Sequence, residues 1–431
     1  MNGDVSGPRL AIARRRARRA RAFAAIAVLG LTAMLPAADA GRIVAVGDIH
    51  GDIEAFTGIL REARLLDADG RWVGGRATLV QTGDYLDRGA HVREVLDLLM
   101  ALERQAPKAG GRAVVLAGNH EMMNMMGDVR DVSAEAFARF ADHGSEARRQ
   151  AAWDAHAALG AKRRAQLERV LPADVIPRVF QPADRDEWMA ARPLGFVEYV
   201  AAFAREGHYG RWLRDRPIVA QVGGTIFLHG GLNPATAARS VDAANTQARR
   251  ELSRWDRMRS TLVSRGIALP FYTFQELVEA MRVELDRAIV QAMRDEQVAP
   301  GGPVPASVSR HPLAELPQVL DWSILHADGP LWFRGFATWA DDEGSAQVDA
   351  LQQRYGAVRF VVGHSVMRPP RINARFGDRV FLIDTGMLAS VYKGRASALE
   401  IAGDRISAIY PGEREALVET SSQQPAASGK R

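Results

Sequence analysis

Three glycine-containing polar loops at nearly equal spacing constrain the fold of this chain more than any other feature. They lie at 47–51 (GDIHG), 83–89 (GDYLDRG) and 118–121 (GNHE), and each follows a short apolar run. Asp48 and Asp84 are 36 positions apart, and Asp84 and Asn119 are 35 apart, each about the length of one strand–helix–strand unit. In such units the carboxyl ends of parallel strands meet at one edge of the sheet, where ligands bind. The spacing therefore predicts an α/β fold in which these polar residues converge.

Two further histidines stand in the same setting. His229 follows the apolar run 225–228, His364 follows the run 360–362 and a glycine, and a second glycine comes directly after His229. Glycine lets the backbone and a bound ion approach closely, so the five loops together predict a metal site. Its ligands would be carboxylate, imidazole and amide groups, because the chain contains no cysteine. A mixed nitrogen and oxygen set of this kind suits Mn, Fe or Zn.

The charge of the chain is concentrated at its N-terminus. The pI is near 9.7, but residues 1–40 hold seven of the 56 basic residues and only two of the 51 acidic ones. Residues 41–431 therefore carry equal numbers of the two signs. Because nucleic-acid binding usually shows as a basic patch on the folded domain, we expect no nucleic-acid partner.

The same N-terminal segment has the pattern of an export signal. A basic region extends to Arg21, an apolar stretch covers 22–36, and Ala38-Asp39-Ala40 resembles a cleavage site. The apolar stretch is shorter than the roughly 20 residues of a membrane-spanning helix. We expect an exported, periplasmic protein that is cleaved after Ala40. An uncleaved membrane anchor formed by 22–36 remains the alternative, and only in that case would the membrane be a partner.

The rest of the chain divides by composition. Residues 41–411 are predicted to form one α/β domain, interrupted by helical insertions at about 128–215 and 235–297. The proline-rich stretch 299–317 is predicted to be a linker. Residues 412–431 are polar and rich in Ser, Gln and Ala, which predicts a disordered tail.

The ordered motif series resembles that of the calcineurin-like metallophosphatases, and within them the Shewanella-like branch of the phosphoprotein phosphatases. The narrower resemblance rests on GNHEMMN at 118–124 and PLWFRG at 330–335. The chain departs from the pattern at Ser365, where threonine is usual. The resemblance implies an αββα sandwich with helical cap insertions and two metal ions.

The resemblance also implies roles for individual residues. Six would bind the two metal ions: Asp48 and His50 the first, Asp84 both as a bridge, and Asn119, His229 and His364 the second. Four would act on the substrate: His120 as general acid, Asp87 as the residue that orients it, and Arg88 and Arg334 as the phosphate clamp. From the residues alone, Asp87 could instead cap a helix, and either arginine could form a structural ion pair.

The implied activity is hydrolysis of phosphomonoesters on a phosphorylated protein or peptide, at phosphotyrosine and/or phosphoserine/threonine, or on a small phosphomonoester. A hydroxide bridging the two ions would attack phosphorus in line. Two alternatives stay open from the sequence. The same site could cleave dinucleoside polyphosphates or phosphodiesters, or the chain could be a non-catalytic binding protein that keeps the fold.

Overall fold

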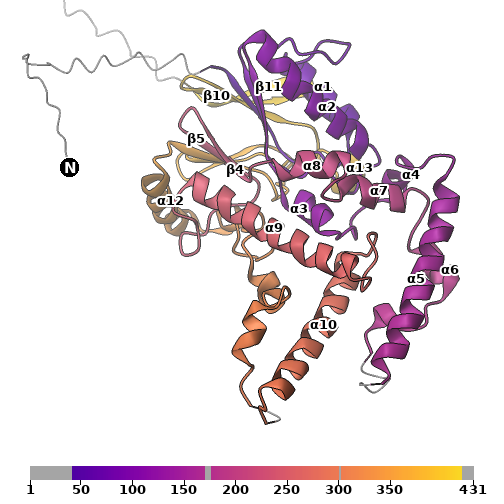
Figure 1. Ribbon diagram of the computed structural model, residues 1–431. Helices are drawn as coiled ribbons and strands as arrows, with labels where there is room; N and C mark the ends of the chain where they lie inside the picture. Colours follow the sequence, from indigo (N-terminus) through magenta and orange to yellow (C-terminus); the bar gives the residue numbers. More distant parts are fainter. Residues whose placement is uncertain (1–40, 170–175, 300–301, 420–431) are drawn as a thin grey trace, which may run out of the picture. The chain divides into compact units, whose positions relative to one another are not determined.

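The computed structural model describes residues 41–169, 176–299 and 302–419, and within these ranges the chain forms two β-sheets with helices on their outer faces (Figure 1). The six-stranded sheet has the order β11-β10-β9-β1-β2-β3. Its strands are β1 (Ile43–Val46), β2 (Thr78–Gln81), β3 (Arg112–Val115), β9 (Ala398–Ala402), β10 (Arg405–Tyr410) and β11 (Glu413–Val418). Strands β1, β2 and β3 are parallel, as the loop spacing predicted.

The five-stranded sheet has the order β4-β5-β6-β8-β7. Its strands are β4 (Val219–Val222), β5 (Thr225–Leu228), β6 (Arg359–Val362), β7 (Asn373–Arg375) and β8 (Val380–Leu382). Strands β4 and β5 form a hairpin whose turn residues, Gly223 and Gly224, both have positive φ, a conformation that favours glycine. Strands β5, β6 and β8 are parallel, so their carboxyl ends also lie at one edge.

The alternation of side chains along the central strands explains the layered arrangement. In β1, Ile43 and Ala45 belong to a core shared by strands of both sheets, whereas Val44 and Val46 pack in the core that includes the helices. In β8, Phe381 faces the first core and its neighbours face the second. Because successive side chains of a strand point to opposite faces, central strands such as β1 and β5, buried at every position, have both faces covered. The result is the predicted αββα sandwich.

The helices join the strands or lie in the two insertions. Those that follow β1, β2 and β3 are α1 (Ile53–Glu62), α2 (Val92–Gln105) and α3 (Asn119–Met126). The first insertion contains α4 (Ala134–Ala138), α5 (Ser145–Leu167), α6 (Arg185–Ala190), α7 (Phe196–Phe203) and α8 (His208–Arg214). The second contains α9 (Val241–Ser264) and α10 (Phe274–Asp295), and α11 (Gly335–Thr338), α12 (Asp341–Tyr355) and α13 (Ala389–Tyr392) come later. Helices therefore occupy both predicted insertions.

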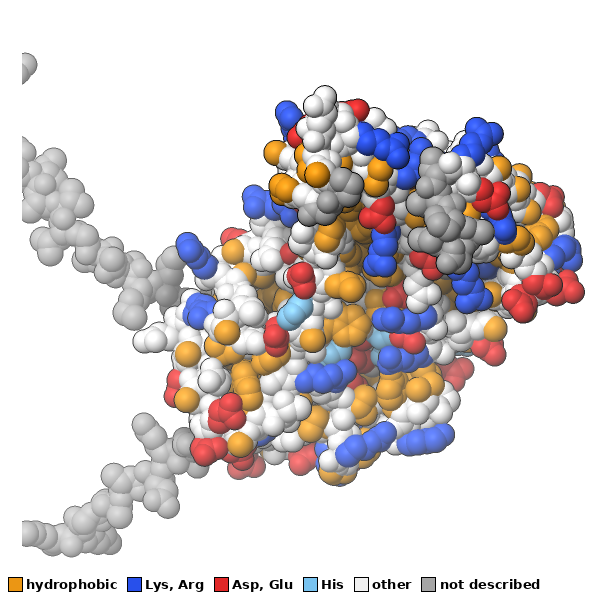
Figure 2. All heavy atoms as spheres, turned by 90° about the horizontal axis from the view of Figure 1, so that it is seen from below, with side chains coloured by type: hydrophobic (Ala, Val, Ile, Leu, Met, Phe, Trp, Pro, Cys, Tyr) orange, Lys and Arg blue, Asp and Glu red, His pale blue; other side chains and the backbone are white. Residues whose placement is uncertain are grey.

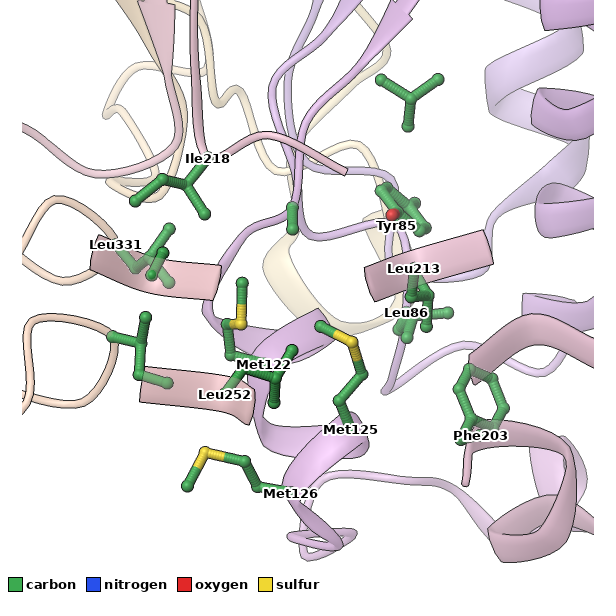
Figure 3. Packing of buried hydrophobic residues seen from close by; sticks show 14 of the residues in the cluster. Tyr85, Leu86, Met122, Met125, Met126, Phe203, Leu213, Ile218, Leu252 and Leu331 are labelled. Carbon is green, nitrogen blue, oxygen red and sulfur yellow. The ribbon is translucent and has the colours of Figure 1, made fainter. Parts of the chain in front are cut away.

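Helix α3 connects the sandwich to these insertions. All eight of its residues are buried. Its methionines Met122, Met125 and Met126 lie among inserted residues such as Leu213 and Leu252 (Figure 3). They pack as apolar side chains, and they fix the helix that carries the GNHE motif against the inserted helices.

The structure differs from the prediction in two segments, the stretch 299–317 and the tail 412–431. The stretch predicted as a linker at 299–317 contains the short 3-10 helix Ala306–Arg310 and the start of another, Leu316–Asp321, and it buries Val308, Leu313 and Leu316. The proline content of this segment suggested a linker, but the apolar residues between the prolines pack on the core.

The predicted disordered tail begins with strand β11, which pairs with β10. This strand has a polar sequence, but its charged side chains form ion pairs, including Arg414 with Glu400 and Arg371 with Glu413 and Glu415. The predicted leader at 1–40 and the last part of the predicted tail, 420–431, lie outside the described residues. None of the described helices is long and apolar enough to span a membrane.

Candidate metal centre

The loops that follow strands β1, β2, β3, β5 and β6 meet at the carboxyl ends of these strands, where the two sheets adjoin. Asp84 stands at the middle of this meeting point. Its Oδ2 atom lies 3.1 Å from Nε2 of His229, 3.7 Å from Nε2 of His120 and 3.9 Å from Nε2 of His50. Two groups of potential ligands share this carboxylate, one with His50 and His120 and the other with His229 and His364. Asp84 thus has the position that a bridging ligand needs.

In three of the imidazoles, a hydrogen bond to a backbone carbonyl fixes which ring nitrogen carries the hydrogen. Nδ1 of His50 donates to the carbonyl of Leu86 (2.8 Å), and Nδ1 of His229 donates to the carbonyl of Thr82 (3.2 Å). Nε2 of His364 donates to a backbone carbonyl at 3.1 Å. In each ring the other nitrogen keeps its lone pair and faces the centre. Bonds of this kind orient the histidine ligands of metal sites in general.

The lone pairs face one another at short range. Nε2 of His229 lies 3.1 Å from Nδ1 of His364 and 2.9 Å from Oδ1 of Asn119. Burial lowers the pKa of His50 to about 3 and the pKa of His364 to about 2, so both rings are neutral at neutral pH. Acceptor atoms that face each other without a proton between them repel, and a cation at their centre removes the repulsion.

Asp48 completes the set on the first side. Its Oδ2 lies 4.0 Å from Nε2 of His50, and its Oδ1 accepts a hydrogen bond from the backbone N–H of His364 (3.0 Å). Burial, followed by the negative charges of Asp384 and Asp84, raises the pKa of Asp48 well above its ordinary value. Asp48, Asp84 and Asp384 thus bring three buried carboxylates together at this centre. The six predicted ligands are therefore together, and their chemistry fits a pair of divalent cations.

Local backbone geometry aims several of these side chains. His50, Asp84, Asp87, Arg88 and His364 all have φ between 48° and 66°, in the left-handed region that residues other than glycine rarely adopt. Such conformations concentrate at functional sites, because surrounding structure must hold them in place. Five of the ten predicted site residues share this feature, and it follows from the sharp turns at the strand ends.

Glycines allow the loops to approach one another this closely. A Cβ atom on Gly118 would lie 2.3 Å from Oδ1 of Asp84, and one on Gly363 would lie 2.3 Å from Oδ1 of Asp48. Either contact is far below van der Waals distance. The glycine beside each ligand motif is thus required by the packing of one ligand against the next loop.

His120 and Asp87 form a buried pair beside the ligands. Nδ1 of His120 donates to Oδ2 of Asp87 at 2.6 Å, and both side chains are buried. Burial alone would lower the pKa of His120, but the charges of Asp84 and Asp87 outweigh burial and raise it to about 9. A metal ligand must offer an unprotonated nitrogen, so the raised pKa, rather than the bond to Asp87, favours a proton on His120.

The two predicted phosphate-binding arginines lie at the mouth of the centre. Both line a pocket of about 330 Å³ together with Asp84, His120 and Tyr392. Arg334 donates to the carbonyl of His364 (2.8 Å), and Arg88 donates to Nε2 of His50 (3.1 Å) and lies over the ring of Tyr392. Figure 2 looks onto a face of the molecule where histidine, acidic and basic side chains gather.

Sequence reasoning gave Glu121 no role, although it is the last residue of the GNHE motif. Its carboxylate is fully buried and accepts four backbone N–H groups: those of Asp84 and Gly118 at 2.7 Å, Tyr85 at 3.0 Å and Leu86 at 3.1 Å. Burial and Asp84 raise the pKa of Glu121 to about 8, and the backbone donors act against this shift. Glu121 thus shapes the loop that presents Asp84. The sequence did not reveal this role, because three of the four donors lie more than 30 positions from Glu121.

Asp384 is the second residue that sequence reasoning missed. It follows strand β8, is buried, and lines the pocket with Asp48 and Asp84. Its Oδ1 accepts the N–H of Gly386 (2.9 Å), and burial raises its pKa to about 6. A signal was present, because Asp384 has the same setting as the predicted ligands: an apolar strand before it and a glycine two residues after it.

Comparison with known proteins agrees with this geometry. Shewanella-like protein phosphatase 2 of Arabidopsis thaliana is 34% identical over 215 residues, which are 48% of this chain and 51% of that protein. Shewanella-like protein phosphatase 1 of Plasmodium berghei is 24% identical over 350 residues, 80% of this chain and 67% of that protein. The matched region thus spans about half the length of the Arabidopsis relative. The predicted branch agrees with the names of both relatives.

A solved structure supports the fold. The cold-active protein-tyrosine phosphatase of a psychrophilic Shewanella species superposes with a TM-score of 0.53 at 21% identity, over 88% of this chain and 80% of that one. At this identity the likeness concerns the fold alone. Residues 41–264, more than half of the chain, match the family model described as calcineurin-like phosphoesterase. The chain therefore belongs to the calcineurin-like phosphoesterase family of metal-dependent enzymes.

Proposed function

We propose that this protein hydrolyses phosphomonoesters of phosphorylated proteins or peptides, at phosphotyrosine and/or phosphoserine/threonine. The observation that carries the proposal is one pocket lined by four of the six predicted metal ligands, by His120 and by both predicted arginines. When bound, two divalent cations would supply an acidified water and positive charge on the phosphate oxygens. Asp48, His50, Asp84, Asn119, His229 and His364 would hold them.

The chain's own residues perform the proton transfer and the positioning. Water attacks phosphorus in line while the bond from phosphorus to the leaving oxygen breaks. His120 gives its Nε2 proton to that oxygen, so the products are inorganic phosphate and an alcohol or phenol. Asp87 holds Nδ1 of His120, which keeps Nε2 turned to the pocket. Arg88 and Arg334, which line the pocket, would bind the remaining phosphate oxygens, a task that suits guanidinium geometry.

Aromatic side chains support a substrate with a ring. Tyr392 and Trp332 both line the pocket, and Tyr392 stacks on His50 with ring centroids 5.5 Å apart. A phenyl phosphate would meet apolar walls beside the arginines. Phosphotyrosine is therefore the substrate that we expect this pocket to favour, with phosphoserine as a second substrate.

The proposal is tested by measuring phosphate release after loading the protein with Mn, Fe or Zn. The panel contains a phosphotyrosine peptide, a phosphoserine peptide, diadenosine tetraphosphate and bis-p-nitrophenyl phosphate. We expect turnover on the peptides and loss of at least about 10³-fold in Asp84→Asn, which keeps the shape but loses the charge at the centre. Faster cleavage of the tetraphosphate or the diester would replace the proposal by the alternative activities. A folded protein that binds no metal and releases no phosphate would be a binding protein.

Export of the chain is a separate proposal, supported by the sequence of residues 1–40. In a Gram-negative host we expect the mature protein in the periplasm, beginning at Gly41, by N-terminal sequencing. Full-length protein that sediments with membranes would show an uncleaved anchor instead.

A further inference from the structure

A buried chain of hydrogen bonds continues from His120 beyond Asp87. Oδ1 of Asp87 accepts a hydrogen bond from Nδ2 of Asn124 (2.8 Å), and Oδ1 of Asn124 accepts one from the hydroxyl of Tyr199 (2.7 Å). All four side chains are at most 3% exposed. The chain thus runs from the mouth of the metal centre into the protein, and solvent does not compete for its bonds.

The donor and acceptor of each bond in this chain of hydrogen bonds can be assigned in one way. The amide of Asn124 uses its two N–H groups on Oδ1 of Asp87 and on the carbonyl of His120 (2.9 Å), so its oxygen must face Tyr199. The hydroxyl of Tyr199 then serves as donor. A flipped amide would instead place its oxygen against the carboxylate of Asp87 and the carbonyl of His120, which are both acceptors.

The consequence for Asp87 is a fixed carboxylate plane. One oxygen of Asp87 is held by His120 and the other by Asn124. With both oxygens bonded, the carboxylate resists rotation, and the imidazole is held with Nε2 3.7 Å from Oδ2 of Asp84. If Asn124 were absent, a single bond would leave the pair free to rotate together.

The last member of the chain comes from the first helical insertion. Tyr199 lies on α7, which packs beside α3, the helix that carries His120 and Asn124 (Figure 1). Its ring is enclosed by Phe203 at 4.4 Å, Phe140 at 4.9 Å and Phe137 at 5.0 Å between centroids. These contacts fix the ring and hence its hydroxyl.

We propose that Asn124 and Tyr199 are positioning residues for the general acid His120, and that the inserted helices thereby control proton delivery to the leaving group. The inference rests on the phosphatase activity proposed above. It predicts that loss of either residue damages protonation of the leaving oxygen and spares the other steps.

Leaving groups of different acidity test this directly. The full-length, metal-loaded protein and its variants are assayed on p-nitrophenyl phosphate, phenyl phosphate and an alkyl phosphate. p-Nitrophenolate departs without a proton, whereas an alkoxide needs one, so a displaced acid slows the poorer leaving groups selectively. For Asn124→Leu we expect kcat to fall about 10- to 100-fold on the phenyl and alkyl esters and less than about threefold on the nitrophenyl ester, with KM and bound metal unchanged.

Tyr199→Phe keeps the ring and removes only the hydroxyl. If Asn124→Leu does not fold, this variant still tests the positioning role. We expect the same selectivity with a smaller fall, about threefold to tenfold on the alkyl ester. Tyr209→Phe is the matched control, because Tyr209 packs on the same phenylalanines Phe140 and Phe203 but gives its hydroxyl to Asp97. The control should show no dependence on the leaving group.

An equal loss on all three esters, or no loss in Tyr199→Phe, would overturn the positioning role. Inactivity of the unmodified protein on every ester would instead refute the phosphatase activity itself. The two failures are therefore distinguished by the unmodified protein alone.

Discussion

At the residue scale, Glu121 shows how a buried carboxyl group outside the pocket lining can organise a site. Its two oxygens accept four backbone N–H groups from the loops of Asp84 and Gly118. These four hydrogen bonds tie two loops to one buried side chain. They hold Asp84, whose backbone lies in the left-handed region, in the orientation that the metal centre requires.

The first prediction concerns Glu121→Gln. The amide group of glutamine would turn N–H donors toward backbone N–H groups that need an acceptor, and unsatisfied buried donors cost about 1–3 kcal/mol. We expect lower stability together with a loss of bound metal, measured by chemical denaturation and by elemental analysis.

Glu251→Gln is the matched control for that measurement. Glu251 is also buried and accepts the backbone N–H of Ile324 and the hydroxyl of Ser323, away from the metal pocket. It should lose stability and keep its metal. Full metal content in Glu121→Gln would show that the four bonds do not shape the site.

At the element scale, β11 shows why composition misled the prediction of a disordered tail. Leu417 and Val418 pack against the core between the sheets, while the preceding Glu413, Arg414 and Glu415 form ion pairs. Exposed ion pairs contribute little individually, about 0–1 kcal/mol each. The backbone ladder with β10 and the burial of the apolar side chains must therefore supply most of the stability of this strand.

The second prediction follows from this pairing. A chain that ends at Gly412 leaves the edge of β10 unpaired and uncovers the core beneath Leu417, so its melting temperature should fall by several degrees. Aggregation should increase, because an unpaired strand edge invites pairing with other chains. A chain that ends at Glu419 retains all of β11 and should melt like the full-length protein. The melting temperatures are measured by circular dichroism. Equal values for both truncated chains would mean that β11 adds no stability.

At the scale of the whole molecule, the metal centre joins the two sheets. Asp48 and Asp84 follow β1 and β2 of one sheet, whereas His229 and His364 follow β5 and β6 of the other. Ligands from both layers converge with their lone pairs and charges facing inward. A cation bound there connects the layers and removes their mutual repulsion.

The third prediction is that metal stabilises the entire fold. A ligand that binds only the folded state at about 100 times its Kd adds about 2.7 kcal/mol. Treatment with a chelator should therefore lower the melting temperature, and Mn or Zn should restore it. In Asp84→Asn the restoration should be much smaller. A melting temperature that does not respond to metal in the unmodified protein would contradict a centre shared by the two sheets.

The sequence by itself determined the fold class and the residues that converge. Equal spacing of strand-ending loops requires parallel strands, and the chemistry of Asp, His and Asn at their ends already implies a cation, because both depend only on local sequence and chain length. Only the tertiary structure decided the rest. Glu121, Asp384 and the chain from Asp87 to Tyr199 act through contacts between segments distant in sequence, such as the 75 positions that separate Asn124 from Tyr199. The linker and the tail were likewise decided by packing and strand pairing, since a polar or proline-rich segment becomes ordered when a neighbouring surface satisfies its apolar side chains and backbone hydrogen bonds.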